Sequence, residues 1–325
     1  MSALARRSVT PLVEEDIRVP IPAGFRLRSG DGLAERQIEM RLQGASGAPL
    51  VAVLGGISAG RHVAGEAGWW REIAAPAGAI DLNAYAVLGL DFAPLTDQRV
   101  RISPADQADL VAIALDALGV SRLHAFVGAS YGGMVGLAFA AAHPARLERL
   151  CVLSAGERPA ALGCAWRGVQ RRIVEYALAR GEGDQGLALA RQLAMTTYRS
   201  AEEFEQRFGG GIDANGRSAV DAYLEARGEA YPQTMAPRRW LSLSEAIDRH
   251  SIDPASVRTP TVLVASASDQ IVPVAAMRAL ATRLPALEAF HVIPSIYGHD
   301  AFLKETAIIG PLISEALKVK SDVQA

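Results

Sequence analysis

Short apolar runs recur along the chain, and most of them end at a glycine or a serine. Runs of this length, bounded by turn residues, are typical of strands that are buried on both faces of a parallel sheet. Helical patterns of apolar residues separate them, and this alternation predicts an α/β fold with a doubly wound, mostly parallel sheet. Functional groups should then collect at the carboxyl ends of the strands. The runs cover residues 50–55, 85–90, 123–128, 149–154, 260–266 and 289–293.

One helix carries a complete start signal. Ser103-Pro104-Ala105-Asp106 combines an N-cap serine, a proline in the first turn and a capping acid. We expect this helix to continue to about Leu118 and to stop at Gly119.

Between about Glu157 and Asp253 the strand signals disappear, and amphipathic patterns replace them. We interpret residues 157–253 as a helical lid inserted into an α/β core formed by residues 1–156 and 254–325. The sheet should resume at Thr261, after two turn-like X-Pro pairs. Placed there, the lid would cover the carboxyl ends of the strands. The amphipathic patterns lie at residues 166–178, 185–194, 201–208 and 220–227.

Composition excludes several classes of function. The 325 residues include 50% hydrophobic ones and have a formal charge of −2, without the basic stripe that nucleic acid binding requires. No apolar run reaches the roughly 20 residues of a membrane span, and none near the amino terminus suits a signal peptide. We expect a cytoplasmic protein that binds neither nucleic acid nor membrane. The two cysteines, Cys151 and Cys164, lie outside any CxxC or Cys/His cluster, so neither a disulfide framework nor a metal site is expected.

Gly128-Ala129-Ser130-Tyr131-Gly132 follows a predicted strand and precedes a helix rich in small residues. This is the context of the nucleophile elbow in the α/β-hydrolase fold, where a strained turn lifts the serine hydroxyl above the sheet. The motif alone is weak evidence in a chain with 30 glycines, but its context favours Ser130 as a covalent nucleophile for acyl transfer.

A serine nucleophile needs a histidine base, and the histidine needs a carboxylate that fixes its tautomer. Of six histidines, His299 lies in a loop just past the last predicted strand, where a base can reach the elbow. Asp269 follows the strand over 260–266. The chain order Ser130, Asp269, His299 is the one expected of this fold. For the oxyanion hole we assign the backbone N–H groups of Tyr131 and of Ile57, the latter in the turn after an early strand.

Several further segments together resemble the homoserine O-acyltransferases of methionine biosynthesis, and the likeness extends from about residue 50 to 305. The segments are Gly55–Val63 (GGISAGRHV), Gly68-Trp69-Trp70, Gly128–Met134, Ala190-Arg191 with Thr196–Ser200, and Tyr297–Asp300.

This resemblance implies a ping-pong reaction in which Ser130 takes an acyl group from coenzyme A and passes it to the hydroxyl of L-homoserine. It implies that Arg191, Tyr198 and Asp300 hold the carboxylate and amino groups of the amino acid. Arg191 and Tyr198 are seven residues apart and so share one face of a predicted helix. The resemblance also implies a homodimer, with acyl-CoA as substrate and no cofactor.

The acyl donor is inferred from two differences between this sequence and the family members that use acetyl-CoA. Members of the family that use acetyl-CoA carry a longer glycine-rich segment after the strand over 85–90, and they lack an arginine at the position of Arg61. The planar guanidinium of Arg61 could bind the free carboxylate of a succinyl group, which favours succinyl-CoA over acetyl-CoA. Arg61 could equally bind the phosphates of coenzyme A or face solvent.

Other functions stay open on sequence grounds. An esterase of the same fold would share Ser130, Asp269 and His299 without needing the amino acid clamp. L-Serine in place of L-homoserine would differ by one methylene, worth only about 1–3 kcal/mol in a pocket. A binding protein without turnover would have no need of all three catalytic groups.

Overall fold

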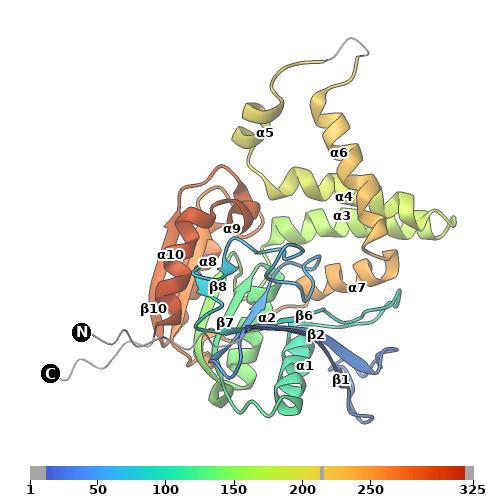
Figure 1. Ribbon diagram of the computed structural model, residues 1–325. Helices are drawn as coiled ribbons and strands as arrows, with labels where there is room; N and C mark the ends of the chain where they lie inside the picture. Colours follow the sequence, from blue (N-terminus) through green and yellow to red (C-terminus); the bar gives the residue numbers. More distant parts are fainter. Residues whose placement is uncertain (1–11, 213–215, 319–325) are drawn as a thin grey trace.

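The apolar runs form the centre of a twisted sheet that has eight strands within the described residues, 12–212 and 216–318, of the computed structural model (Figure 1). The strand order is β1-β2-β6-β3-β7-β8-β9-β10. Strand β2 is antiparallel to both β1 and β6, whereas the strands from β6 to β10 are parallel. The bounds are β1 Leu12–Pro20, β2 Gln37–Ala45, β3 Leu50–Leu54, β6 Ala86–Leu90, β7 Leu123–Ala129, β8 Leu147–Leu153, β9 Thr261–Ser266 and β10 Leu287–Ile293. A separate pair, β4 Ala74–Ala75 and β5 Ile80–Asp81, forms a small parallel sheet. The predicted fold class and the predicted strands are confirmed.

Strands β1 and β2 were not predicted, because charged residues interrupt their apolar pattern. Strand β1 reads LVEEDIRVP and is largely exposed at the edge of the sheet. Charged side chains on an edge strand are a common protection against pairing with other chains.

The helices of the core cover both faces of the sheet. Along β3, Ala52 and Leu54 enter one apolar cluster, while Val51 and Val53 enter the other. This alternation follows from the two-residue period of a strand. Helices α1, α2 and α8 contribute to the first cluster and α10 to the second. The bounds are α1 Pro104–Ala117, α2 Tyr131–Ala142, α8 Val274–Arg283, α9 Ala301–Lys304 and α10 Thr306–Leu317, with short 3₁₀ turns η1 Pro144–Arg146, η3 Pro254–Ser256 and η4 Gly298–Asp300.

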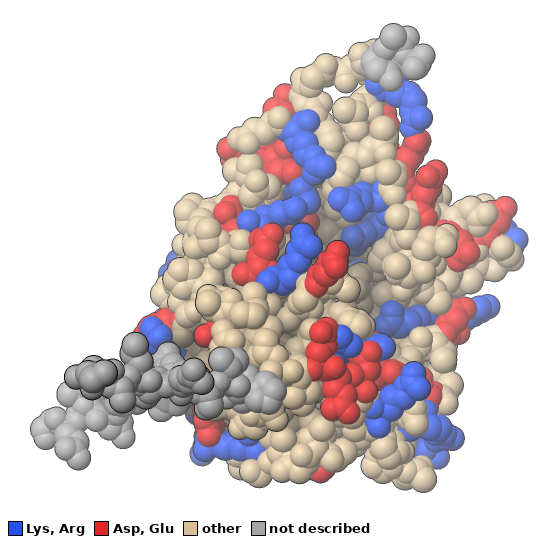
Figure 2. Space-filling model, in the orientation of Figure 1, with Lys and Arg blue, Asp and Glu red and all other residues tan. Residues whose placement is uncertain are grey.

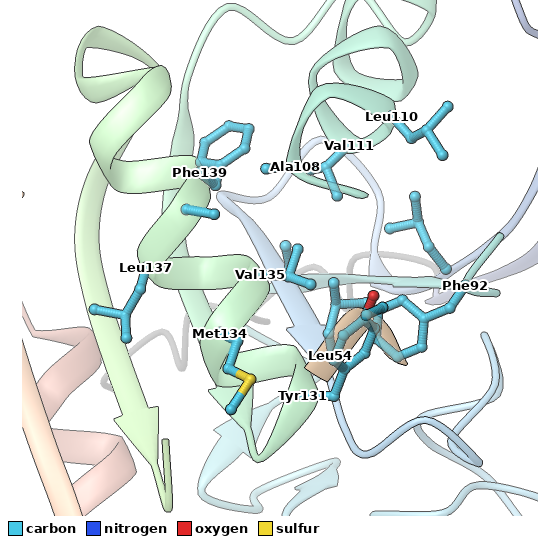
Figure 3. Packing of buried hydrophobic residues seen from close by; sticks show 14 of the residues in the cluster. Leu54, Phe92, Ala108, Leu110, Val111, Tyr131, Met134, Val135, Leu137 and Phe139 are labelled. Atoms are coloured by element: carbon cyan, nitrogen blue, oxygen red, sulfur yellow. The ribbon is translucent and has the colours of Figure 1, made fainter. Parts of the chain in front are cut away.

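The packing of α1 against α2 buries the elbow helix. Figure 3 shows side chains of α2, among them Val135 and Phe139, directed towards Ala108 and Val111 of α1. Helix α1 begins as predicted, since Ser103 and Asp106 each accept a hydrogen bond from the other's backbone N–H. The packing against α1 therefore holds in place the helix that follows Ser130.

The segment between β8 and β9 is helical and lies over one end of the sheet (Figure 1). We refer to α3–α7 as the lid helices. Predicted helix 201–208 matches α5, whereas α3 and α4 begin earlier than predicted and α4 also ends later. The bounds are α3 Ala161–Leu178, α4 Gly183–Tyr198, α5 Ala201–Phe208, α6 Ala219–Ala230 and α7 Pro237–Asp248, with the 3₁₀ turn η2 Tyr231–Gln233. No helix in the described part of the chain is long and apolar enough to cross a membrane.

Candidate active site

Ser130 sits in a sharp turn between β7 and α2, with φ 54° and ψ −120°. A positive φ is costly for a residue with a side chain, and such strain gathers at functional sites. Two glycines make the turn possible. A Cβ on Gly132 would lie 2.1 Å from the carbonyl oxygen of Leu54, and a Cβ on Gly128 would lie 2.4 Å from that of Gly132. The elbow motif is thus explained by a close approach of backbones.

The structure brings Ser130, His299 and Asp269 together. Ser130 Oγ lies 2.7 Å from His299 Nε2, and His299 Nδ1 lies 2.7 Å from Asp269 Oδ2. Asp269 follows β9 and His299 lies in η4, just past β10, so both come from the carboxyl ends of neighbouring strands. The other oxygen of Asp269 accepts two backbone hydrogen bonds of 2.9 Å, from Ile271 and Val272. These bonds hold the carboxylate in line with the imidazole.

The environment of His299 favours its protonated form. Burial of the ring by itself lowers the pKa, but the charge of Asp269 and its hydrogen bond more than offset this, so that the pKa is raised above 6.5. Asp300 adds to the rise and Arg167 opposes it. An imidazole that is stabilised as a cation, beside a serine hydroxyl, can take that hydroxyl's proton as the serine attacks a carbonyl.

Of the two predicted oxyanion donors, one directly follows Ser130 in the chain and the other lines the same cavity. Tyr131 is the first residue of α2, so its N–H has no acceptor within the helix. Its ring is buried in the core with its edge against Phe92, at 4.8 Å between centroids, which leaves only its backbone for the site. Ile57, in the loop after β3, lines the same cavity as Ser130. An amide pair in these positions can stabilise negative charge on a carbonyl oxygen.

A cavity of about 500 Å³ opens above the elbow, between the core and the lid helices. Figure 2 shows a hollow between these two parts of the surface, with Lys and Arg side chains gathered around it. Ser130 and His299 form part of its floor, and residues of α3, α4 and α6 form the opposite wall. The walls mix apolar side chains such as Trp69 and Met134 with charged ones. Such a site suits a ligand that has both apolar and charged groups.

Arg191, Tyr198 and Asp300, which the family resemblance singled out, all line this cavity. The Arg191 guanidinium lies 5.5 Å from the centroid of the Tyr198 ring and makes no ion pair with any described carboxylate. Asp300 Oδ2 accepts a hydrogen bond of 3.2 Å from Arg199 Nε. The three side chains therefore present to the cavity one carboxylate and one cation that has no ion-pair partner among the described residues.

Sequence reasoning missed two residues that shape this wall. Tyr231 is buried, carries the Arg191 guanidinium 4.6 Å from its ring centroid, and shares a 2.8 Å hydrogen bond between hydroxyls with Ser58 of the loop after β3. Arg199 is held by Glu203 at 2.5 Å as well as by Asp300. The i,i+4 spacing of Arg199 and Glu203 was a signal for that pair. Nothing in the sequence marked Tyr231.

The structure does not support the predicted role of Arg61 in binding the acyl donor. It is not among the residues that line the cavity with Ser130. Its Nε lies 3.0 Å from Asp16 Oδ1, and its Nη1 lies 2.5 Å from Asp91 Oδ2. Two carboxylates already satisfy this guanidinium, so the placement does not fit a role in binding the carboxylate of a succinyl group.

No group of three His, Cys, Asp or Glu side chains within residues 12–212 and 216–318 is arranged to hold a metal ion. Both cysteines are free, and burial raises the pKa of Cys151 to about 12.

The chain is similar to several known proteins. Residues 49–306 match the family described as having the α/β-hydrolase fold. A homoserine O-succinyltransferase of Xanthomonas campestris pv. campestris is 42% identical over 300 residues, which cover 90% of this chain and 81% of that protein. A homoserine O-acetyltransferase of Mycobacterium avium is 30% identical over 316 residues, covering 82% and 81%. Among solved structures, a homoserine O-acetyltransferase from Bacillus anthracis has a TM-score of 0.82 at 16% identity, covering 95% of this chain and 98% of that one. Esterase E22 has a TM-score of 0.82 at 15% identity, covering 95% and 100%.

Proposed function

Because the chain belongs to the α/β-hydrolase family and, within it, to the homoserine O-acyltransferases, we propose that it transfers a succinyl group from succinyl-CoA to L-homoserine. The product, O-succinyl-L-homoserine, serves methionine biosynthesis. The observation that carries the proposal is the contact of 2.7 Å between Ser130 Oγ and His299 Nε2 on the floor of a cavity whose wall holds Arg191 beside the Tyr198 ring. The succinyl donor rests on the 42% identity to the Xanthomonas enzyme.

The first half-reaction forms an acyl-enzyme. Ser130 Oγ attacks the thioester carbonyl while His299 Nε2 takes its proton, and the N–H groups of Ile57 and Tyr131 stabilise the negative oxygen. The carbon–sulfur bond then breaks, and the proton on His299 goes to the departing sulfur. Asp269 keeps Nδ1 protonated throughout, so that Nε2 always faces the serine.

The second half-reaction repeats these steps with L-homoserine. His299 removes the proton from the homoserine hydroxyl, which attacks the ester carbonyl and releases Ser130. The amino acid carboxylate would bind Arg191 beside the Tyr198 ring, and its ammonium would bind Asp300. A bound acceptor hydroxyl in a cavity enclosed by the lid helices has a large entropic advantage over water, which favours transfer over hydrolysis.

These steps use side chains and backbone amides, with acyl-CoA as a substrate rather than a cofactor. A homodimer and a cytoplasmic location complete the proposal. The homodimer is an expectation from the family and the cytoplasmic location one from the sequence, and size-exclusion chromatography with light scattering would test the first.

The direct test measures thiol release from succinyl-CoA and from acetyl-CoA, each with L-homoserine, with L-serine and without an acceptor. We expect release that depends on L-homoserine and is fastest with succinyl-CoA. Thiol release at the same rate without any acceptor would indicate a hydrolase instead. A higher rate with L-serine than with L-homoserine would show that L-serine is the acceptor.

A further inference from the structure

Arg167 lies on α3 in the wall of the active-site cavity, with 11% of its side chain exposed. Its Nε and Nη2 lie 2.8 and 2.7 Å from Asp248 Oδ1, on the last residue of α7. Nη2 also approaches Cys164 Sγ at 3.7 Å. Its Nη1 makes no hydrogen bond to any residue in the described part of the chain. One edge of this guanidinium is thus still able to donate.

The charge around Asp248 is not balanced. Arg171 Nη1 lies 2.7 Å from Asp248 Oδ2, so two guanidinium groups share a single carboxylate. Neither arginine contacts a second carboxylate among the described residues. The group therefore keeps one net positive charge behind the cavity wall, where partial burial strengthens its attraction for an anion.

Gly163 leaves the guanidinium open to the cavity. A Cβ at this position would lie 3.2 Å from Arg167 Nη1 and 3.3 Å from Nη2. Gly163 itself lines the cavity, so the free edge of Arg167 lies beside open space. The charge of Arg167 also opposes protonation of His299, which places it within electrostatic reach of the reacting serine.

Gln170 provides a second, independent donor on the same wall. It lies three residues after Arg167, hence on the same face of α3, and it lines the cavity although only 4% of it is exposed. Its amide makes no hydrogen bond to a residue within the described ranges. Because Gln170 lines the cavity, its amide can donate a hydrogen bond to an anion bound there.

The other cations near the site are less suited to bind an anion beside Ser130. Arg61 and Arg199 each contact two carboxylates. Arg227 and Lys304 also line the cavity, but both are exposed, where water screens their charge. Arg191 is assigned to the acceptor.

We propose that Arg167, assisted by Gln170, binds the free carboxylate of the succinyl group while the other end of that group is esterified to Ser130. The inference rests on the proposed function, and it moves donor selection from the loop of Arg61 to helix α3. Acetyl has no such carboxylate, so Arg167 distinguishes a dicarboxylic acyl donor from a simple one.

The test compares kcat/KM for succinyl-CoA and acetyl-CoA, with L-homoserine as acceptor, in R167Q, Q170L and the matched control R171Q. Arg171 pairs with the same carboxylate but is not among the cavity-lining residues. Loss of a hydrogen bond between charged groups should lower the succinyl-to-acetyl ratio about tenfold or more in R167Q. We expect a fall of a few-fold in Q170L and in R171Q, because R171Q removes the net charge of the group but leaves the donating edge of Arg167 in place.

An unchanged ratio in R167Q, or an equal fall in R171Q, would overturn the inference. R167K keeps the charge but loses the planar fork, so a ratio between those of wild type and R167Q would support it even if R167Q folds poorly. The wild-type enzyme separates the two proposals. Absence of L-homoserine-dependent transfer from succinyl-CoA contradicts the proposed function, whereas such transfer together with a wild-type succinyl-to-acetyl ratio in R167Q contradicts only the role of Arg167.

Discussion

The floor and the opposite wall of the active-site cavity are built on different principles. The floor, at the elbow, is fixed by backbone contacts, because Gly128 and Gly132 allow β7, α2 and the end of β3 to approach closely and hold Ser130 in a strained turn. The wall, formed by the lid helices, is held by side chains, among them Arg167, Arg171 and Asp248. A floor of this kind sets the chemistry. The charged side chains of the wall can be replaced without disturbing the sheet. We therefore expect the wall to determine which substrates bind.

This difference predicts which property of the enzyme a substitution in each region should change. Changes on the floor should lower all reactions of the enzyme together or reduce its stability. Changes in the wall should alter the preference for one substrate over another and leave the fold intact.

The largest expected effect on the floor comes from D269N. An amide in place of the carboxylate would favour the wrong tautomer of His299, so we expect kcat to fall about 10⁴-fold with either donor. The raised pKa of His299 means that activity in the wild-type enzyme declines as the pH falls through a value above 6.5, where the base becomes protonated. In D269N the acidic limb of the profile of kcat/KM against pH should move to lower pH, because the stabilising charge is gone. A limb that stays in place would show that Asp269 does not act through His299.

G132A should act on stability rather than on one substrate. The new Cβ would lie 2.1 Å from the carbonyl oxygen of Leu54, so the backbone must shift, and we expect the free energy of unfolding to fall by about 3 kcal/mol. Chemical denaturation measures this. G56A is the control, since a Cβ at Gly56 meets nothing within 4 Å. Equal stability of the two variants would contradict the account of the elbow.

R191Q tests the wall. Loss of the cation that would bind the acceptor carboxylate should raise KM for L-homoserine by roughly 10- to 100-fold, while the acyl-enzyme still forms. The matched control is R180Q, because Arg180 also lies over a tyrosine ring, that of Tyr176, but outside the cavity. Initial rates at varied L-homoserine concentration give KM for both variants, and we expect it to rise only in R191Q. An effect on the acylation step alone would argue against the assignment.

The smallest effect is expected from R61Q. Its partly exposed ion pairs with Asp16 and Asp91 should contribute about 1 kcal/mol to the free energy of unfolding. The succinyl-to-acetyl ratio of kcat/KM should stay within about twofold of wild type. A tenfold fall in that ratio would restore Arg61 to the donor site and weaken the case for Arg167.

The sequence predicted the parallel strands and the positions of Ser130, Asp269 and His299, because each depends on local patterns: short apolar runs, glycine spacing and the residues that follow a strand. The position of Arg61 could not be predicted in the same way. Its partner Asp16 is 45 residues away on β1. That strand was not predicted, because its residues are largely charged and exposed. The contact between Arg167 and Asp248 joins two helices 81 residues apart and depends on how the lid helices pack. Local patterns carry no information about such pairings.

The central claim is that Ser130 carries the acyl group between the two half-reactions. The direct measurement is mass spectrometry of the enzyme after brief mixing with succinyl-CoA in the absence of an acceptor, followed by peptide mapping. Our account predicts a mass increase of one succinyl group on the peptide that contains Ser130, its loss on addition of L-homoserine, and no adduct in S130A. Formation of O-succinyl-L-homoserine by S130A at the wild-type rate, or an adduct on another residue, would contradict it.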